Sequence, residues 1–572
     1  MQAFKATRMD WVYSTNASFV AEAHKRGLEV TLAMNPQCFD TGKSTTEVGR
    51  VLNIHGERLV APWMRKWSSK PRYYGCVNNP DYLTIAFDFA SHLLDIGSDG
   101  IQHDDPGSNF ETTSWDGGDP SLSGCYCEHC MAGFTKHLMS NLSAPELTRL
   151  NVTASFNYKE LLLREPWNGT SPIVKALRPL FVAYQQNVTE TYLHSLKSHI
   201  DTKASSLGRA TSLSCNKGAG WQSLMACDYV LGELDADDAT PEGLEAIYVL
   251  LLPAGKAQVM TMPKHHNVTL VNTPAFEVLI RTSIAYTYAL GSNMVAPWDI
   301  YLPTPSATRY YGTASQYGDL FAFVRRNGAL LDGTTERVPD PLNPAGEPTH
   351  YYHNFSGGAP GQLGRRFRFP FPYTAPGYTG ERIGGSRFTD QSLLTCETLC
   401  DSSALCRGIF YYGGTCYTLN ELVECETTLR GDSYMKNLSA APHNRSATEP
   451  VANSSVADVR VKVRRSANRS VAAVHMVDWR HALPSIWSTG VLPNTSFPPF
   501  QLNVSNAILK DGVACNALEF VLHQLGSDHP PKAVKGPCVG NVTVLTLPSP
   551  VPWSLLEVRA AHTHTAEQRV SL

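Results

Sequence analysis

The sequence predicts an α/β barrel followed by two smaller β-rich units, and three observations carry this prediction. Over the first 330 residues, short apolar strands alternate with longer helical stretches, as in parallel α/β architectures. Five cysteines then fall within residues 396–425, a density typical of a small disulfide-stapled module. After residue 456, apolar and polar residues alternate with period two, which indicates an antiparallel β-sandwich.

The barrel prediction depends on seven candidate strands. They lie at 9–15, 28–35, 99–105, 209–216, 227–234, 256–263 and 292–301. Helical candidates lie between them, for example 17–27 and 80–97, and the second carries an apolar stripe of helical period. A (β/α)8 TIM-type barrel needs eight strands, so we expect that this chain lacks the first one. The absence of a signal peptide from the chain agrees with that expectation.

Changes in composition along the chain predict the domain boundaries. We expect a barrel at 1–333, a linker at 334–379, a disulfide-rich module at 380–437, a glycosylated linker at 438–455 and a β-sandwich at 456–562. The cysteines of the module are Cys396, Cys400, Cys406, Cys416 and Cys425, and at least two pairs among them should be disulfides. Cys515 and Cys538 are candidates for a disulfide within the sandwich.

The composition indicates the cellular compartment of the protein and argues against some classes of binding partner. Hydrophobic residues make up 42% of the chain and the formal net charge is −3, so no nucleic-acid partner is expected. The longest apolar run is too short for a membrane span. The chain carries 14 N-x-S/T sequons and 14 cysteines, which together predict a secreted or cell-surface glycoprotein with disulfides.

Acidic and aromatic residues follow the predicted strands, where a parallel barrel places its active site. Glycoside hydrolysis needs two carboxyl groups, and Asp104 or Asp105 can supply one and Glu233 the other. Acids beside flat aromatic rings suit a sugar, whose C–H faces stack on the rings. The candidate sugar-binding side chains are Asn35, Trp115, Asn216, Trp221, His265, Trp298, Asp299 and Tyr301.

Four segments together resemble the barrel glycoside hydrolases: "DGIQHDDP", "CYCEHCMAGF", "APWDIY" and, in the C-terminal sandwich, "VHMVDWR". The C-x-C-x2-C element is similar to one in family 42 β-galactosidases, which binds a structural zinc together with an upstream cysteine. Cys76 occupies the corresponding place. The resemblance therefore implies a zinc held by Cys76, Cys125, Cys127 and Cys130, for which four thiolates are suited. Disulfides among these cysteines are the alternative in an oxidising compartment.

The acids of the chain depart from that family. Family 42 carries an Asn-Glu pair after the fourth strand and a glutamate nucleophile on the seventh. If the lacking strand is counted as the first, the strand at 99–105 is the fourth and the strand at 256–263 is the seventh. Here "HDDP" ends the fourth strand, and "VMTMPKHH" on the seventh has no carboxylate. Acids on strands four and six resemble the α-galactosidase and α-glucosidase barrels, where the strand-four aspartate is the nucleophile. The resemblance thus implies a glycosidase-like barrel without implying galactose as the substrate.

A second resemblance concerns the disulfide-rich module. "CETLCDSSALCRGIFYYGGTCYTL", with "DSYMK" downstream, resembles PAN/Apple modules. Those modules bind protein or carbohydrate, so the resemblance implies a glycan or protein ligand for this part of the chain.

The leading hypothesis is a secreted retaining glycosidase that acts on an extracellular polysaccharide or glycan and needs no cofactor for catalysis. Asp104 is the predicted nucleophile and Glu233 the predicted general acid/base. The alternative is a non-catalytic carbohydrate-binding or adhesion protein built on the same barrel. A third interpretation takes "HDD" and "KHH" as metal ligands of a deacetylase, although the chain has no H-x-x-x-H spacing there.

Overall fold

The structure is a computed structural model of the 572-residue chain. It describes residues 5–35, 48–61, 71–165, 167, 171–216, 226–249, 256–263, 265, 267–271, 273–295, 314–337, 452–456, 458–494, 496–510, 513–526, 530–550 and 552–560, together with short strands between 352 and 436.

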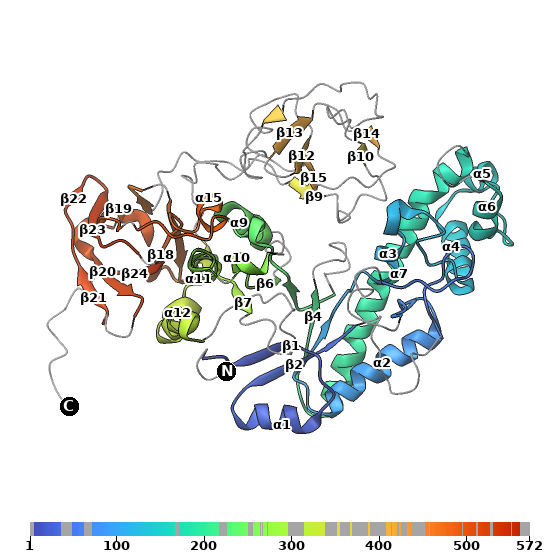
Figure 1. Ribbon diagram of the computed structural model, residues 1–572, viewed down its shortest axis with the longest axis horizontal. Coiled ribbons are helices and arrows are strands. Elements are labelled where there is room, and N and C mark those ends of the chain that lie inside the picture. The colour runs from blue at the N-terminus through green and yellow to red at the C-terminus, as the bar shows by residue number, and fades with distance from the viewer. Residues whose placement is uncertain are drawn as a thin grey trace.

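A seven-stranded parallel sheet forms the first part of the molecule, and its strands are ordered β1 to β7 as in the chain (Figure 1). The strands are β1 (Arg8–Val12), β2 (Glu29–Met34), β3 (Gly100–His103), β4 (Ser212–Asn216), β5 (Tyr229–Gly232), β6 (Ala257–Thr261) and β7 (Asn293–Val295). All seven predicted strands and their order are confirmed. The sheet is a nearly closed barrel. It is not fully closed within the described residues, because no hydrogen-bonded ladder joins β1 to β7 there. That the first strand of an eight-stranded barrel is lacking stays a prediction.

Helices lie between successive strands of the barrel. They include α1 (Ala17–Lys25), α2 (Pro80–Asp95), α7 (Pro172–Ser206), α9 (Pro241–Val249) and α11 (Pro274–Ala289). The local sequence sets their starts: the Asn79 side chain accepts a backbone N–H of α2, and Pro80 occupies the first helical position, where it loses no hydrogen bond. Ala86, Ala90 and Leu93 of α2 are fully buried, as the predicted apolar stripe requires.

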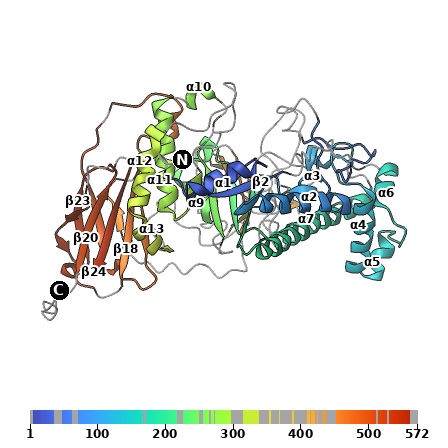
Figure 2. The ribbon, with the colours of Figure 1, turned by 90° about the horizontal axis from the view of Figure 1, so that it is seen from below.

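A helical lobe is inserted between β3 and α7 and lies away from the sandwich (Figure 2). It contains α3 (Ser108–Thr112), α4 (Glu128–Asn141), α5 (Ala144–Arg149) and α6 (Tyr158–Arg164). Phe134 of α4 packs edge-on against Tyr158 and Phe181, with ring centroids 5.4 and 5.1 Å away. This aromatic core fixes the lobe to α7, which returns the chain to the barrel.

The predicted C-terminal sandwich is confirmed as two antiparallel sheets. One contains β16 (Ala452–Ser454), β19 (Phe500–Ser505), β23 (Val542–Leu547) and β22 (Cys538–Val539). The other contains β21 (Lys532–Val534), β20 (Leu518–Gln524), β24 (Trp553–Ala560), β18 (Val471–Asp478), β17 (Val459–Arg465) and β8 (Glu336–Arg337). Buried aliphatic side chains such as Val474, Leu502 and Leu545 form the core between the two sheets.

The six-stranded sheet also packs against the barrel helices α11 and α12 (Ala314–Arg326). Phe323 of α12 meets Trp553 of β24 with ring centroids 4.9 Å apart. Lys462 of β17 and Glu245 of α9 form a buried ion pair of 2.9 Å. The barrel and the sandwich therefore share one hydrophobic interface.

Three described strands fall within the predicted linker at 334–379, and each pairs with a later strand of the chain; β10 (Phe367–Arg368) pairs with β14 (Val423–Glu424). β8 pairs with β17 of the sandwich, and β9 (Tyr352–Asn354) pairs with β15 (Asp432–Lys436). β9 is thereby the edge of a five-stranded sheet that also holds β11 (Arg387–Phe388), β12 (Gly408–Tyr412) and β13 (Thr415–Leu419). Apart from Cys416 in β13, the cysteines of the predicted PAN/Apple module lie outside the described residues, so the module stays a prediction.

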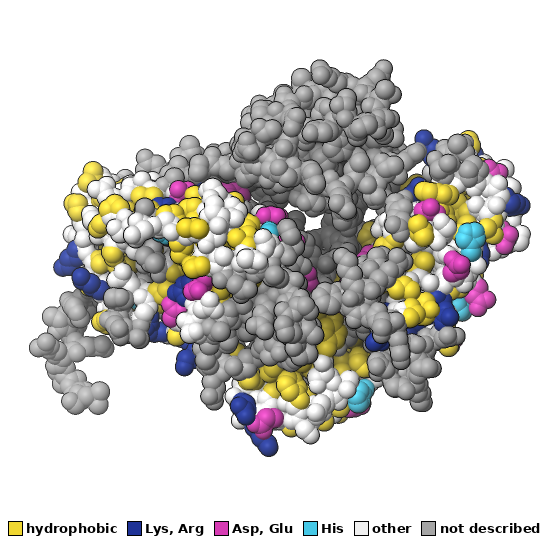
Figure 3. Space-filling model, viewed as in Figure 1, with side chains coloured by type: hydrophobic (Ala, Val, Ile, Leu, Met, Phe, Trp, Pro, Cys, Tyr) yellow, Lys and Arg dark blue, Asp and Glu magenta, His cyan; other side chains and the backbone are white. Residues whose placement is uncertain are grey.

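No helix in the described part of the chain combines the length and the apolar character needed to cross a bilayer. On the face shown in Figure 3, the described Lys and Arg side chains are interspersed with Asp and Glu.

Candidate functional site

Polar side chains stand at the C-terminal ends of five neighbouring barrel strands. Asn216 is the last residue of β4, while Tyr13, Asn35, Asp104 and Glu233 directly follow β1, β2, β3 and β5. The strands are parallel, so these ends lie at the same mouth of the barrel. The predicted residues Asn35, Asp104, Asn216 and Glu233 thus lie at the same end of the barrel, and the side chains of Asn35 and Asn216 contact Asp104.

Asp104 lies at the centre of this site. Its Oδ1 accepts hydrogen bonds from the Asn216 side chain at 2.7 Å and from the Asp105 backbone N–H at 3.0 Å. Its Oδ2 accepts from the Asn35 side chain at 2.9 Å and from the Tyr13 hydroxyl. Four donors therefore engage both oxygens of the Asp104 carboxyl group and fix its orientation.

Glu233 lies on the same face of the sheet as Asp104. His103 pairs with Cys215 and Asn216 pairs with Leu231, so the rows of the sheet align Asp104, Asn216 and Leu231. Glu233 is two residues beyond Leu231, and side chains two apart point the same way. Adjacent strands are about 4.8 Å apart, which places the two backbones roughly 10 Å apart with β4 between them.

Asp105 is held in a left-handed backbone conformation with φ of +50°. This conformation is uncommon for an aspartate and is a form of local strain found at functional sites. The Asn35 amide donates to Asp105 Oδ2 at 3.1 Å, and the Tyr74 hydroxyl donates to the Asp105 carbonyl at 3.2 Å. Asn35 therefore bridges the two predicted acids, and Asp105 orients Asp104 through its backbone N–H.

A half-buried carboxyl group that sequence reasoning missed lies near Asp104 and Asp105. Glu111 of α3 is 3.4 Å from the Tyr74 hydroxyl. Burial raises the pKa of Glu111 to about 7, hydrogen bonds from Trp115 and Tyr74 oppose the shift, and the charge of Asp104 adds to it. Trp115, one of the predicted sugar-binding residues, packs edge-on against Tyr74 with ring centroids 5.2 Å apart. Because Tyr74 also contacts Glu111, Trp115 lies close to this carboxyl group.

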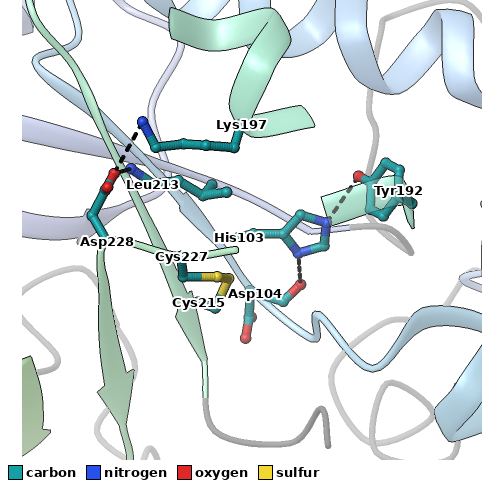
Figure 4. Close-up of a disulfide and its surroundings, with 8 residues drawn as sticks. All are labelled: His103, Asp104, Tyr192, Lys197, Leu213, Cys215, Cys227 and Asp228. Carbon is teal, nitrogen blue, oxygen red and sulfur yellow. Dashed lines mark hydrogen bonds and ion pairs between the residues drawn. A yellow bond between two sulfur atoms is a disulfide. The ribbon is translucent and has the colours of Figure 1, made fainter. Parts of the chain in front are cut away.

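His103 faces away from the mouth and secures the backbone of Asp104 (Figure 4). Its Nδ1 is 2.9 Å from the Asp104 carbonyl and its Nε2 is 2.9 Å from the Tyr192 hydroxyl. Because a carbonyl only accepts, Nδ1 carries the proton and Nε2 accepts from Tyr192. Burial lowers the pKa of His103 to about 4, which keeps the ring neutral. Both nitrogens are engaged, so His103 is unsuited to the metal-ligand role of the deacetylase interpretation.

A disulfide that the sequence analysis did not predict joins Cys215 of β4 to Cys227, two residues before β5 (Figure 4). Cys215 directly precedes Asn216, so the bond fixes a donor of the site to the next strand. In the sandwich, Cys538 is disulfide-bonded, while the side chain of its predicted partner Cys515 lies outside the described side chains.

The four cysteines predicted to hold zinc converge. Cys76, Cys125, Cys127 and Cys130 are buried and free, and their sulfurs all lie within 4.8 Å of one another. Cys76 Sγ is 3.7 Å from Cys127 Sγ and 3.6 Å from Cys130 Sγ. A tetrahedral ion with Zn–S bonds of about 2.3 Å requires sulfurs about 3.8 Å apart. The donor set therefore fits zinc.

Asn109 connects this cysteine cluster to the loop after β3 that carries Asp104 and Asp105. Its amide nitrogen lies 3.3 Å from Cys76 Sγ and 3.3 Å from Cys130 Sγ, and its carbonyl oxygen accepts the Val77 N–H at 3.0 Å. Amide N–H groups directed at sulfur are the contacts expected around metal-bound thiolates. Since Asn109 is five residues after Asp104, the cluster anchors the loop that carries the predicted nucleophile.

The structure places His265 beside a short helix of the C-terminal part of the chain, and its predicted role in sugar binding stays a prediction. Its ring packs edge-on against Trp487 of α15 (Pro484–Trp487) at 5.7 Å, and its Nδ1 accepts the Asn267 backbone N–H at 3.1 Å. The predicted sugar-binding residues Trp221, Trp298, Asp299 and Tyr301 lie outside the described residues.

Sequence reasoning missed Tyr13, Tyr74, Glu111 and Asn109. Tyr13 had a signal, because it lies near the C-terminal end of the first predicted strand at 9–15. Tyr74 and Asn109 meet the site through long-range contacts that no local pattern encodes.

Comparisons with known proteins show a likeness of structure without a likeness of sequence. No family model matches the chain, and no curated protein matches it. Among solved structures, the chain is similar to the α-L-fucosidase isoenzyme 2 from Paenibacillus thiaminolyticus, at 11% identity over 98% of this chain and 95% of that chain, with a TM-score of 0.49. It is also similar to Gan42B, a GH42 β-galactosidase from G. stearothermophilus, at 10% identity over 98% of this chain and 94% of that chain, with a TM-score of 0.49.

A β-galactosidase from the psychrophilic Marinomonas ef1 is a third similar structure, at 11% identity over 58% of this chain and 57% of that chain, with a TM-score of 0.42. All three are glycoside hydrolases. All three TM-scores are below 0.5, so these likenesses carry no conclusion about the function of this chain.

Proposed function

We propose that this protein is a secreted retaining glycoside hydrolase that acts on an extracellular polysaccharide or glycan. The observation that carries the proposal is the position of Asp104, whose carboxylate is held by donors from β1, β2 and β4 at the mouth of the barrel. Glu233 supplies a second carboxyl on the same face two strands away. Two such groups flanking a glycosidic bond are the requirement for this chemistry.

In the proposed first step, Asp104 Oδ2 bonds to the anomeric carbon while the bond to the leaving oxygen breaks, and Glu233 gives its proton to that oxygen. In the second step, Glu233 takes a proton from water, the water oxygen attacks the anomeric carbon, and the bond to Asp104 breaks with its electron pair returning to the carboxylate. Asp105 orients Asp104 through its backbone N–H.

We also propose that Cys76, Cys125, Cys127 and Cys130 hold a structural zinc. The support is the fit of the sulfur separations and the two amide contacts of Asn109. The ion would supply a crosslink between the segment at 71–79 and the start of α4, and no catalytic step uses it.

The test uses a panel of aryl glycosides and algal, plant and fungal polysaccharides with the full-length glycosylated protein. Asp104→Asn and Glu233→Gln should each lower turnover at least about a hundredfold, the lower end of acid–base contributions. Asp237→Asn, in an exposed turn, is the control and should leave turnover unchanged. Glycan binding that survives both substitutions, with no cleavage by the wild type, would instead support the non-catalytic carbohydrate-binding protein.

A further inference from the structure

The first barrel strand contains an irregularity that determines which side chain reaches Asp104. Met9 pairs with Val30 and Val12 pairs with Leu32, so three steps along β1 match two steps along β2. The extra residue is accompanied by Trp11 in a left-handed conformation with φ of +56°. A bulge of this kind bends the strand and redirects the side chains beyond it.

The bulge exchanges the two faces of β1. Before it, Arg8 and Asp10 face the barrel interior, where Arg8 donates to Thr31 Oγ1 at 2.9 Å and Asp10 accepts from the Tyr229 hydroxyl at 2.6 Å. In a regular strand the next inward residues would be the even-numbered ones. Because one residue is inserted, the odd-numbered Tyr13 turns inward instead and donates to Asp104 Oδ2.

Tyr13 differs from the other donors to Asp104 in its exposure. Asn35 is 7% exposed and bridges both acids, Asn216 belongs to β4, and the fourth donor is backbone. Tyr13 is 54% exposed, and its oxygen also accepts from Trp11 Nε1 at 3.4 Å. The lone pairs of the carboxylate are taken up by four donors, so an attacking oxygen must first release one of them.

We infer that Tyr13 is a further catalytic residue, which covers Asp104 Oδ2 in the free enzyme and releases it to the anomeric carbon when sugar binds. This inference rests on the proposed retaining mechanism. With Trp11 still hydrogen-bonded to its oxygen, the Tyr13 hydroxyl turns its proton away from Oδ2 and presents a lone pair to the sugar ring oxygen, where positive charge develops during the attack. In the second step it donates to Oδ2 again, which stabilises the departing carboxylate.

The variant Tyr13→Phe separates the two steps. Attack on an activated dinitrophenyl glycoside should persist, so kcat/KM should stay within about threefold of wild type. Hydrolysis of the glycosyl-enzyme should slow about tenfold to a hundredfold, because a hydrogen bond to a developing charge is lost. The covalent adduct should then accumulate and appear as the mass of one sugar unit on the intact protein. Tyr317→Phe, in α12 away from the site, is the matched control.

Each outcome has one meaning. Equal falls in kcat and kcat/KM without an adduct would show that Tyr13 acts only on substrate binding or on the fold, and wild-type kinetics in Tyr13→Phe would show that it has no role. Either result overturns the inference while leaving the mechanism in place. Inversion of product configuration by the wild type, full activity of Asp104→Asn, or no cleavage of any substrate overturns the proposed function and the inference together. If the Tyr13→Phe protein fails to fold, a Trp11→Phe variant replaces it. In this variant the covalent adduct should accumulate to a smaller extent than expected for Tyr13→Phe. Wild-type kinetics in Trp11→Phe would then overturn the inference.

Discussion

The side-chain amide of Asn216 donates a hydrogen bond of 2.7 Å to Asp104 Oδ1, across two neighbouring strands of the barrel. The residue before Asn216 is Cys215, whose disulfide to Cys227 closes a separation of 12 residues. The position of the predicted nucleophile therefore depends on a covalent bond that is remote from it in the sequence.

Removing the disulfide should affect both stability and turnover. The paired variant Cys215→Ala with Cys227→Ala should lose about 2–4 kcal/mol of unfolding free energy, the usual contribution of a disulfide. Turnover should fall at least about tenfold, because a small displacement of Asn216 changes the geometry of Asp104. Urea unfolding and steady-state kinetics measure the two effects. Unchanged turnover in a folded variant would show that β4 is held by its neighbours alone.

Zinc binding should follow the four cysteines. We expect one zinc per chain by elemental mass spectrometry, and its loss in Cys130→Ser. Asn109→Ala removes the two amide contacts to sulfur and should weaken zinc affinity about tenfold to a hundredfold. His129→Gln, whose ring lies beside Glu128 outside the cluster, should keep the metal. Metal-free protein in which these cysteines resist alkylation until reduction would show disulfides instead.

The pKa of Glu111 predicts a loss of activity at alkaline pH. Burial raises this pKa from 4.5 to about 7, so the neutral form is favoured in the folded protein. Its contribution to stability is fully present below pH 4.5 and is lost as the pH rises through 7. Ionisation also adds a negative charge that Asp104 senses, so kcat/KM should fall above about pH 7. Glu111→Gln should remove this limb of the pH profile, and the exposed Glu128→Gln should retain it.

His475 predicts acid sensitivity of the interface between barrel and sandwich. The ring lies parallel to Trp553, with centroids 5.8 Å apart, and burial lowers its pKa from 6.5 to about 3, assisted by the charge of Arg464. The stability it contributes is present above pH 6.5 and is lost as the pH falls toward 3. Between pH 7 and pH 5 this amounts to about 2 kcal/mol.

Urea unfolding of His475→Leu at both pH values should show a smaller difference than the wild type. His55→Gln, at an exposed position, should behave as the wild type does. An unchanged pH difference in His475→Leu would assign the acid sensitivity to other groups.

The sequence by itself determined where the barrel strands lie and which polar residues stand at their C-terminal ends. Alternating apolar strands and helices define a parallel barrel, and the ends of parallel strands meet at one mouth, so Asn35, Asp104, Asn216 and Glu233 could be placed together before any coordinates. The spacing of Cys125, Cys127 and Cys130 likewise indicated a cluster. These are local patterns with a fixed geometric meaning.

Tertiary structure decided which atoms meet. The bulge at Trp11 reverses the faces of β1 and brings in Tyr13, although apolar alternation over so short a strand cannot locate an inserted residue. The Cys215–Cys227 bond and the Asn109 contacts depend on strand register and on the path of the inserted lobe. Glu111 acquires its raised pKa only from burial beside Tyr74 and Asp104. Such contacts join residues far apart in the chain, and their energies arise after the chain has folded, so no local segment of the sequence encodes them.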